Sequence, residues 1–149
     1  MGLLLAGCSL SFGQNNNVLG VAPSAPLQAK VGATVEAKLP LELRAGYHLN
    51  SNTPSDAYLI PLKLTWNPGP IDAAGVIYPK PQMEKYSFSD KPLSVFSGNF
   101  ELVTRFKVPA NAIVGPTAIT GKLRYQACND TMCLAPKTID VRLQVDIVK

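Results

Sequence analysis

The stretch KTIDVRLQVDIV, residues 137–148, alternates apolar and polar side chains along its whole length. Its apolar residues fall at every second position: Ile139, Val141, Leu143, Val145 and Ile147. Side chains two residues apart lie on the same face of an extended chain, so this period predicts a half-buried β-strand. The segment NFELVTRFKV, residues 99–108, shows the same period and predicts a second strand of the same kind.

Shorter segments with apolar alternation or β-forming residues predict further strands at residues 33–43, 46–50, 60–66, 75–78 and 117–125. Turn-forming residues separate them, such as Asn-Pro-Gly-Pro at 67–70. No run of ten or more residues has the i, i+3, i+4 apolar spacing of an amphipathic helix. About seven short strands joined by turns predict an all-β fold, an immunoglobulin-like antiparallel β-sandwich formed by residues 27–149.

The composition of the 149-residue chain restricts the class of protein further. Apolar residues make up 46% and charged residues 16%, which indicates a compact globular domain rather than a disordered chain. The 13 prolines and 11 glycines are spread along the sequence, as short strands and turns require. The net charge of +4 comes from scattered Lys and Arg residues, whereas nucleic-acid binding usually gathers them in a stripe, so we expect no nucleic-acid partner.

The N-terminus, MGLLLAGCSLSFGQ, begins with a short apolar run that includes Leu-Ala-Gly-Cys at positions 5–8. This run resembles the lipobox of bacterial lipoproteins, in which the cysteine, here Cys8, becomes the lipid-bearing first residue. It is too short to span a bilayer, which takes about 20 apolar residues. We expect residues 1–13 to be an export or lipoprotein signal and residues 14–26 a polar tether. The alternatives are ordinary cleavage near residues 11–13 and an apolar N-terminus without a targeting role.

Two cysteines, Cys128 and Cys133, lie in YQACNDTMCLAPKTI, residues 125–139, between two expected strands. As a structural staple they would close a loop of about six residues, which contributes only about 2 kcal/mol in the chain-entropy model. A zinc site would need more ligands than the single histidine, His48, can add, and a c-type haem would need a histidine where Leu134 stands. We therefore expect no metal and no cofactor. A redox pair in a short surface loop could open and close without moving the fold, so spacing alone leaves the structural and redox uses open.

The sequence around the pair resembles a known family. YQACNDTMCLAPKTIDVRL, residues 125–143, is similar to the cysteine segment of the N-terminal periplasmic domain of the thiol:disulfide interchange protein DsbD. GYHLNSNTPSDAYLIPLKLTW at 46–66 and YPKPQMEKYSFSDKPLSVFSGNFELVTRFKVP at 78–109 resemble its early strand pair and its central segment. The likeness extends over residues 27–149. It implies an immunoglobulin-like sandwich that carries one exchangeable disulfide and has no thioredoxin fold.

The resemblance also implies a relay of reducing equivalents in the periplasm. In the family, this domain receives them from a multi-helix membrane thiol reductase and passes them to thioredoxin-like periplasmic proteins. Carried over, Cys133 forms the mixed disulfide with the partner and Cys128 resolves it. The full-length family proteins continue beyond this domain, so a chain ending at Lys149 is expected to be either a free-standing version or a fragment. The rival hypothesis is a non-catalytic exported β-sandwich that binds a partner and has a structural local disulfide.

The family covers its cysteine pair with a loop that bears an aromatic residue and moves aside when the partner docks. KYSFSDK, residues 85–91, falls in the matching region and is here named the cap loop. Phe88 is the expected shield, and Tyr86 lies two residues before it. The alternative is that both belong to one face of an ordinary strand.

Three further residues are candidates for lining the site. His48 and Asn50 share one face of the strand expected at 46–50, near the sulfur atoms according to the resemblance. A positively charged His48 would lower the pKa of a nearby thiol, whereas a packed or surface histidine would have no such role. Tyr125 lies three residues before Cys128, and we expect it to belong to the sandwich rather than to the chemistry.

Overall fold

The computed structural model describes residues 17–149, so the expected signal at 1–13 and the lipid site Cys8 lie outside the described residues and stay predictions. Within residues 17–149 no helix is long and apolar enough to cross a membrane. The strands of that part are β1 (Leu19–Val21), β2 (Leu27–Lys30), β3 (Thr34–Leu43), β4 (His48–Asn50), β5 (Lys63–Trp66), β6 (Asp72–Ile77), β7 (Gln82–Glu84), β8 (Leu93–Ser97), β9 (Phe100–Lys107), β10 (Gly115–Tyr125), β11 (Ala127–Cys128) and β12 (Lys137–Val148).

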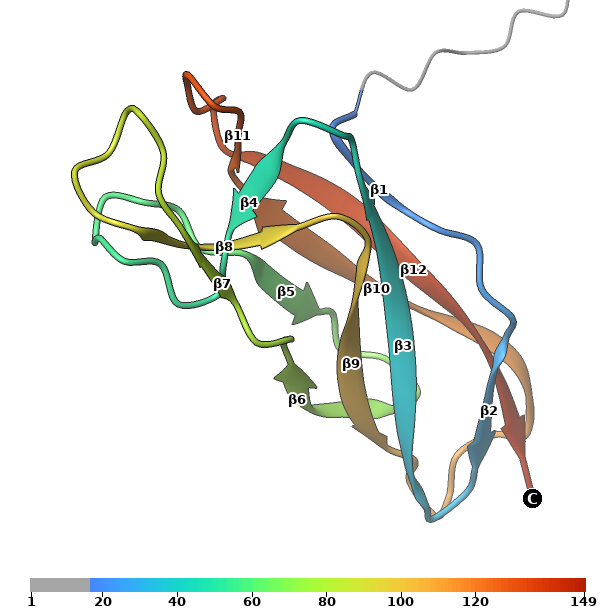
Figure 1. Ribbon diagram of the computed structural model, residues 1–149. Helices are drawn as coiled ribbons and strands as arrows, with labels where there is room; N and C mark the ends of the chain where they lie inside the picture. The colour runs from blue at the N-terminus through green and yellow to red at the C-terminus, as the bar shows by residue number, and fades with distance from the viewer. Residues whose placement is uncertain (1–16) are drawn as a thin grey trace, which may run out of the picture.

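These strands form three sheets, two of which face each other as the layers of a sandwich (Figure 1). The first layer has the order β1-β3-β9-β6 and the second β2-β12-β10-β5, while the third sheet, β11-β4-β8-β7, lies at one end. The predicted all-β, immunoglobulin-like antiparallel sandwich is confirmed. One pairing departs from the antiparallel pattern, because β2 runs parallel to β12.

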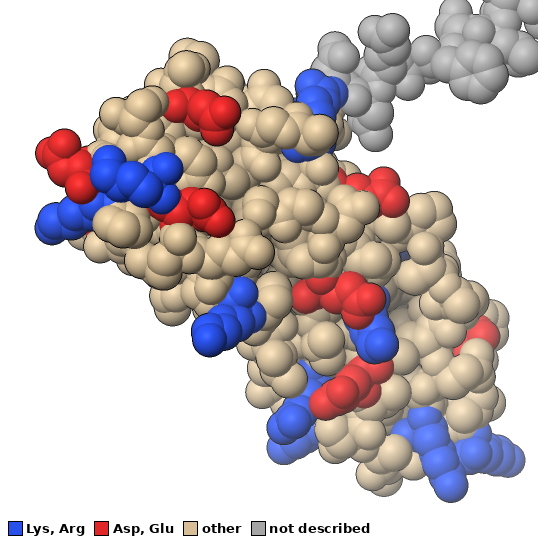
Figure 2. Space-filling view, in the orientation of Figure 1, with Lys and Arg blue, Asp and Glu red and all other residues tan. Residues whose placement is uncertain are grey.

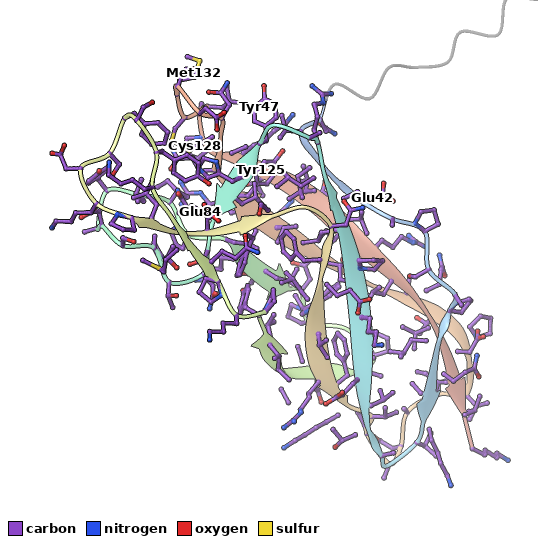
Figure 3. All side chains as sticks on the ribbon, viewed as in Figure 1. Glu42, Tyr47, Glu84, Tyr125, Cys128 and Met132 are labelled. Carbon is purple, nitrogen blue, oxygen red and sulfur yellow. A yellow bond between two sulfur atoms is a disulfide. The ribbon has the colours of Figure 1, made fainter. Side chains whose placement is uncertain are left out.

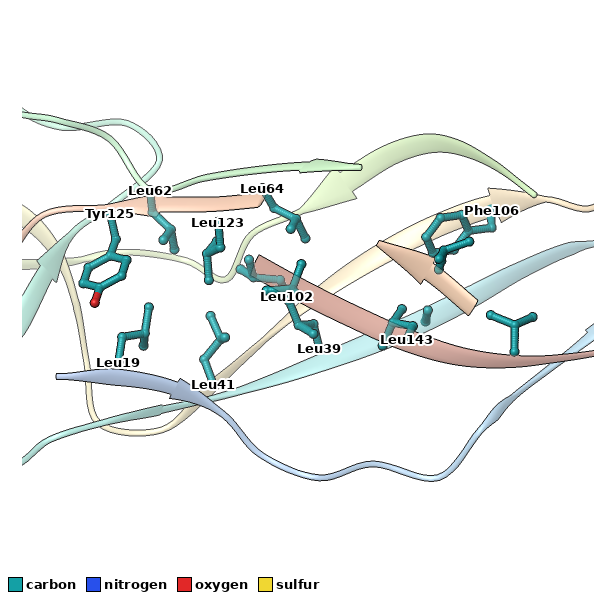
Figure 4. Close-up of a cluster of buried hydrophobic side chains, with 14 of the residues drawn as sticks. Leu19, Leu39, Leu41, Leu62, Leu64, Leu102, Phe106, Leu123, Tyr125 and Leu143 are labelled. Carbon is teal, nitrogen blue, oxygen red and sulfur yellow. The ribbon is translucent and has the colours of Figure 1, made fainter. Parts of the chain in front are cut away.

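The core lies between the two layers, where the alternating residues of the long strands meet (Figure 4). In β12 the apolar residues Val141, Leu143, Val145 and Ile147 are buried, as their two-residue period predicts. Leu39 of β3 and Leu102 of β9 are buried in the same cluster from the opposite layer. Burial of this apolar surface stabilises the fold, and neither Cys128 nor Cys133 belongs to this cluster.

Charged side chains lie mainly on the outside and in mixed order. On the face drawn in Figure 2, basic and acidic residues are interspersed and form no single-sign stripe. The ion pairs recorded among residues 17–149 are Arg105–Glu36 at 3.2 Å and Lys122–Asp140 at 2.6 Å, and all four side chains are exposed. Exposed pairs of this kind contribute about 0–1 kcal/mol each, so packing rather than charge holds the layers together.

Part of the expected tether belongs to the sandwich. Leu19 is fully buried, and β1 pairs with β3 from Leu19–Leu43 to Val21–Leu41. The prediction of a polar tether over residues 14–26 is therefore wrong for Leu19–Val21. A strand of three residues is too short to display a period, and its Asn- and Pro-containing flanks have the composition of a linker. The chain then crosses to the other layer over residues 22–26, where two prolines cannot donate to a β-ladder.

Replacing Leu19 by alanine tests whether β1 is part of the core. We expect Leu19→Ala to lower the free energy of unfolding by about 2–5 kcal/mol, because the change leaves a cavity in a fully buried site. Val21→Ala, at an exposed position of the same strand, should change it by about 0.5 kcal/mol or less. Urea denaturation of both variants measures the difference, and equally small effects would contradict the assignment of β1 to the core.

Candidate functional site

The cysteine pair lies where the two longest strands of the second layer end. The pairing of β10 with β12 stops at Tyr125–Lys137, and Cys128 and Cys133 fall in the connection just beyond it. That placement agrees with the sequence prediction that the two cysteines lie between two strands. Directly after β10, the chain enters β11, which pairs with β4 of the third sheet. The pair is therefore held by both the sandwich and the end sheet.

Cys128 and Cys133 form a disulfide with an Sγ–Sγ distance of 2.04 Å and a Cα–Cα distance of 3.9 Å. They stand opposite each other as an antiparallel bridge. Backbone hydrogen bonds close the hairpin on both sides of them, from Asn129 N to Met132 O and from Leu134 N to Ala127 O, each 2.8 Å long. Because these bonds do not involve sulfur, they can keep the two cysteines facing each other when the disulfide is open.

The four residues between the cysteines, 129–132, are here named the Cys loop. The Asn129 side-chain oxygen accepts hydrogen bonds from the backbone nitrogens of Thr131 and Met132, at 3.0 and 2.9 Å. An asparagine that binds its own backbone two and three residues on makes a tight turn. Met132 is 55% exposed and lies at the outer end of this loop, beyond Cys128 (Figure 3).

The two sulfur-bearing residues differ in burial. Cys128 is fully buried, whereas Cys133 is only partly buried. Thiol–disulfide exchange begins with attack by a thiolate that must reach a sulfur atom. Cys133 is therefore the more accessible target of the pair, and Cys128 is sequestered behind it.

The cap loop packs over the face of the end sheet that carries Cys128. His48 is the residue directly opposite Cys128 in the β4–β11 pairing, so their side chains share a face. The Tyr86 ring stacks on the His48 ring, with centroids 4.0 Å apart and planes at 13°. Phe88 stacks on Tyr86 at 5.5 Å. Residues 85–91 lie between β7 and β8 and are a loop, so the alternative of an ordinary strand is wrong.

A hydrogen bond joins the cap loop to the Cys loop. The Ser87 hydroxyl donates to the backbone oxygen of Asp130 at 3.0 Å. In Figure 1 the two loops lie at the same end of the molecule, the cap loop between β7 and β8 and the Cys loop next to β11. The contact is exposed and consists of one neutral bond, so opening the cap loop breaks little beyond the aromatic stack.

His48 is 3% exposed, and its Nε2 atom is buried without a hydrogen-bond partner among the described residues. Burial lowers the pKa of His48 below its ordinary value of 6.5, and the negative charge of Asp130 opposes this. The ring is therefore neutral at neutral pH. The hypothesis that a charged His48 lowers a thiol pKa does not hold there, because desolvation outweighs the nearby carboxylate.

Asn50 and Gln126 brace the hairpin. The Asn50 amide donates to the Gln126 side-chain oxygen at 2.9 Å and to the Ile60 backbone oxygen at 3.2 Å. The Gln126 amide donates in turn to the backbone oxygen of Leu134, next to Cys133, at 3.4 Å. The sequence analysis did not single out Gln126. The signal that could have identified it is a polar residue between the buried Tyr125 and Ala127.

Tyr125 belongs to the sandwich core. It is buried, and its hydroxyl points toward Leu19 from the opposite side of the cluster (Figure 4). Burial raises the pKa of Tyr125, and a hydrogen bond with the Leu19 backbone works in the opposite direction. In residues 17–149 no group of three or more His, Cys, Asp or Glu side chains gathers in a way that could hold a metal ion.

A family model described as "Thiol:disulfide interchange protein DsbD, N-terminal" matches residues 16–144, most of the chain. The chain belongs to the DsbD N-terminal domain family. Domains of this family carry a redox-active disulfide for thiol–disulfide exchange, which is consistent with an oxidoreductase. In the described part of this DsbD N-terminal domain the recorded disulfide is Cys128–Cys133.

Two solved structures are similar to this DsbD-type domain. The N-terminal periplasmic domain of ScsB from Proteus mirabilis is 13% identical, with a TM-score of 0.54 over 86% of this chain and 44% of that chain. The reduced DsbD N-terminal domain from Neisseria meningitidis is 14% identical, with a TM-score of 0.49 over 73% of this chain and 76% of that one. The chain thus spans less than half of the ScsB structure, and the likeness shows the fold alone. No curated protein sequence matches the chain significantly.

The acidity of His48 in this DsbD-type domain can be measured directly, because it is the single histidine of the chain. We expect NMR titration to give a pKa below 6.5, and Asp130→Asn to lower it further by removing the charge that raises it. Because the pKa of His48 is lower in the folded than in the unfolded state, the unfolded state binds a proton more readily. The stability that this difference contributes is present above pH 6.5 and is lost as the pH falls through the folded-state pKa. Acidification should therefore destabilise the wild type more than His48→Phe. A pKa at or above 6.5 would contradict the burial of the neutral ring.

Proposed function

We propose that this domain relays reducing equivalents in the periplasm through a reversible Cys128–Cys133 disulfide. It would receive them from a multi-helix membrane thiol reductase and pass them to thioredoxin-like proteins. Family membership supports the chemistry, and the relatives named above are periplasmic or N-terminal DsbD domains. The observation that carries the proposal is a disulfide that bridges a hairpin already closed by backbone hydrogen bonds on both sides.

Energetics favour a bond kept for its chemistry over a bond kept for stability. A disulfide that closes about six residues contributes about 2 kcal/mol by the chain-entropy model, against nearly 5 kcal/mol for a loop of about a hundred residues. The apolar core lies elsewhere, between the two layers. Reduction would therefore leave the sandwich intact and would change the Cys loop only locally.

The unequal burial of the cysteines supports a division of roles. Starting from the reduced domain, the Cys133 thiolate attacks one sulfur of a partner disulfide, which gives a mixed disulfide and frees one partner thiolate. Cys128 then attacks Cys133 Sγ, which re-forms the internal disulfide and frees the second partner thiolate. Two electrons pass to the partner in all. Cys133 is the partly exposed residue and Cys128 the fully buried one, as this order requires.

The aromatic residues of the cap loop would shield the pair until a partner docks. Tyr86 lies directly on His48, and Phe88 packs on Tyr86 with 38% of its surface exposed. Phe88 on one loop and Met132 on the other also offer exposed apolar side chains. A partner that covered these two residues would replace the cap contacts with its own and gain access to Cys133.

Single-cysteine variants test the relay. We expect Cys128→Ser, first reduced, to accumulate a covalent adduct with an oxidised thioredoxin-like periplasmic protein, because Cys133 can attack but the resolving thiol is missing. Cys133→Ser should give far less adduct, since its remaining thiol is buried. Non-reducing gel electrophoresis with mass spectrometry identifies the linked residues. The relay is refuted if neither variant gives an adduct.

The reduction potential of the disulfide distinguishes the relay from the rival hypothesis of a structural disulfide. Equilibration with glutathione buffers should give a potential above about −300 mV, in the range of exchange proteins. A lower value would mark a bond that the glutathione pool cannot reduce. The binding module with a structural staple would then be the better explanation.

Removal of the cap aromatics tests the shield. We expect Phe88→Ala and Tyr86→Ala to speed reduction of the disulfide by a small thiol, measured by the loss of oxidised protein with time. Phe88→Ala should change the free energy of unfolding by about 0.5 kcal/mol or less, because the side chain is partly exposed. Met83→Ala, an exposed apolar position on β7, is the matched control. Rates equal to those of this control would remove both aromatics from the site.

A further inference from the structure

His48 holds a buried nitrogen that the fold alone does not explain. Its Nε2 has no hydrogen-bond partner among the described residues, and a buried polar atom left unpaired costs about 1–3 kcal/mol. A phenylalanine could stack on Tyr86 equally well and would carry no such cost. The residue directly across the strand pair from His48 is Cys128, whose side chain lies on the same face. The residue that carries the unpaired nitrogen is thus directly opposite one of the two reacting residues.

We propose that His48 is the proton acceptor for the Cys128 thiol in the resolving step. The inference rests on the proposed relay, because it assigns a role within that reaction. Directly opposite residues have Cβ atoms about 4.5–5.5 Å apart, which brings an imidazole ring within reach of the opposite sulfur. Cys128 is fully buried, so bulk water is poorly placed to take its proton. In the disulfide form Cys128 carries no proton, whereas the reduced thiol would supply a donor to the unpaired nitrogen.

The other polar groups around the ring are less suited to accept this proton. Burial, Glu84 and Asp130 together raise the pKa of Tyr86, so its hydroxyl stays protonated. Ser97, opposite His48 on β8, has an ordinary hydroxyl that donates to Gln82. Asp130 is the charged group whose field acts on His48; its side chain is on the exposed Cys loop, and it favours the imidazolium that proton transfer creates.

The proton and the electrons balance within the step. In the mixed disulfide, Cys128 holds a thiol and Cys133 is bonded to a partner sulfur. Proton transfer from Cys128 Sγ to His48 Nε2 leaves a thiolate, which attacks Cys133 Sγ and forms the internal disulfide. The bond from Cys133 to the partner breaks, and the partner sulfur leaves with the electron pair as a thiolate. His48 later returns its proton to that thiolate or to water.

The same arrangement works in the opposite direction. When an incoming dithiol reduces the domain, Cys128 is the thiolate that leaves, and a protonated His48 can return the proton to it. The Tyr86 ring, 4.0 Å away and nearly parallel, restricts the plane of the imidazole in both directions. Tyr86 is in this respect a positioning residue, distinct from the proton acceptor that it covers.

A two-phase reaction with a small disulfide isolates the step. The reduced domain is mixed with an aromatic disulfide whose thiolate product absorbs visible light. The first release of chromophore reports attack by Cys133, and the second reports resolution by Cys128. In the wild type we expect the second rate constant to rise through the pKa of His48 and then to stay level above neutral pH. In His48→Phe, which keeps the stack, it should rise about tenfold for each pH unit until the thiol itself ionises near pH 8.5 or above.

The variant should therefore be about tenfold or more slower at pH 7, and the gap should close at alkaline pH. His48→Gln, which keeps a polar side chain but no base, should behave in the same way. Ser97→Ala, at the position across from His48 on β8, should match the wild type. The first release should change by less than about twofold in every variant, and a cooperative thermal unfolding transition confirms that each is folded.

Two results would overturn the assignment while leaving the relay standing. One is an unchanged second rate constant in both His48 variants, and the other is a slowing by the same factor at every pH, which a merely structural role would give. A different failure would speak against the relay itself. If the wild type releases no chromophore, or releases it with no internal disulfide formed, the proposed function is wrong.

Discussion

The pairing of β10 with β12 is the constraint on which the rest of the structure depends. It runs without a break from Gly115–Ile147 to Tyr125–Lys137 and supplies the central strands of one side of the core. Because the hairpin with Cys128 and Cys133 leaves directly from the end of this ladder, the two cysteines are placed by the most extensively paired strands of the domain. β11 then joins β4, so the hairpin is also anchored to the end sheet. A cysteine pair supported on both sides keeps its geometry whether the disulfide is formed or open.

This support explains how a β-sandwich can carry exchange chemistry. A bond across so few residues adds little to stability, and the hydrogen bonds at Asn129 and Leu134 hold the hairpin without it. Breaking and re-forming the disulfide therefore changes mainly the covalent bond and requires little change in conformation. Full burial of Cys128, in contrast, makes the exchange harder. It protects the resolving sulfur, but it also removes that sulfur from the water that could take its proton. A buried thiol that must ionise needs a base in its own surroundings, and His48 is the neighbour that meets this need.

The sequence was informative where one face of a strand is buried and the other is solvated. The long strands β3, β9, β10 and β12 were predicted within a few residues because their two-residue period reports that asymmetry. β8 was missed because four consecutive residues, Leu93 to Phe96, are buried, which leaves no alternation to detect. At the site, the cysteine pair and the cap loop were predicted from the resemblance. The bond from Ser87 to Asp130 spans 43 residues and the bond from Asn50 to Gln126 spans 76, and such contacts leave no local pattern.

The state of His48 shows why burial had to be known before chemistry could be assigned. The sequence left two alternatives open for His48, a positive charge that would favour thiolate and a packed or surface residue without such a role. The stacked Tyr86 and the surrounding sheet desolvate the ring instead, and the neutral form results. A neutral imidazole can accept a proton, whereas a charged one cannot. If a docking partner displaces the cap loop, water returns to the ring and the pKa of His48 rises toward its ordinary value, which stabilises the proton that it has taken from Cys128. Shielding and proton transfer would then be controlled by the same aromatic contact, with the closed cap loop keeping the base neutral and the open one helping it to hold the proton.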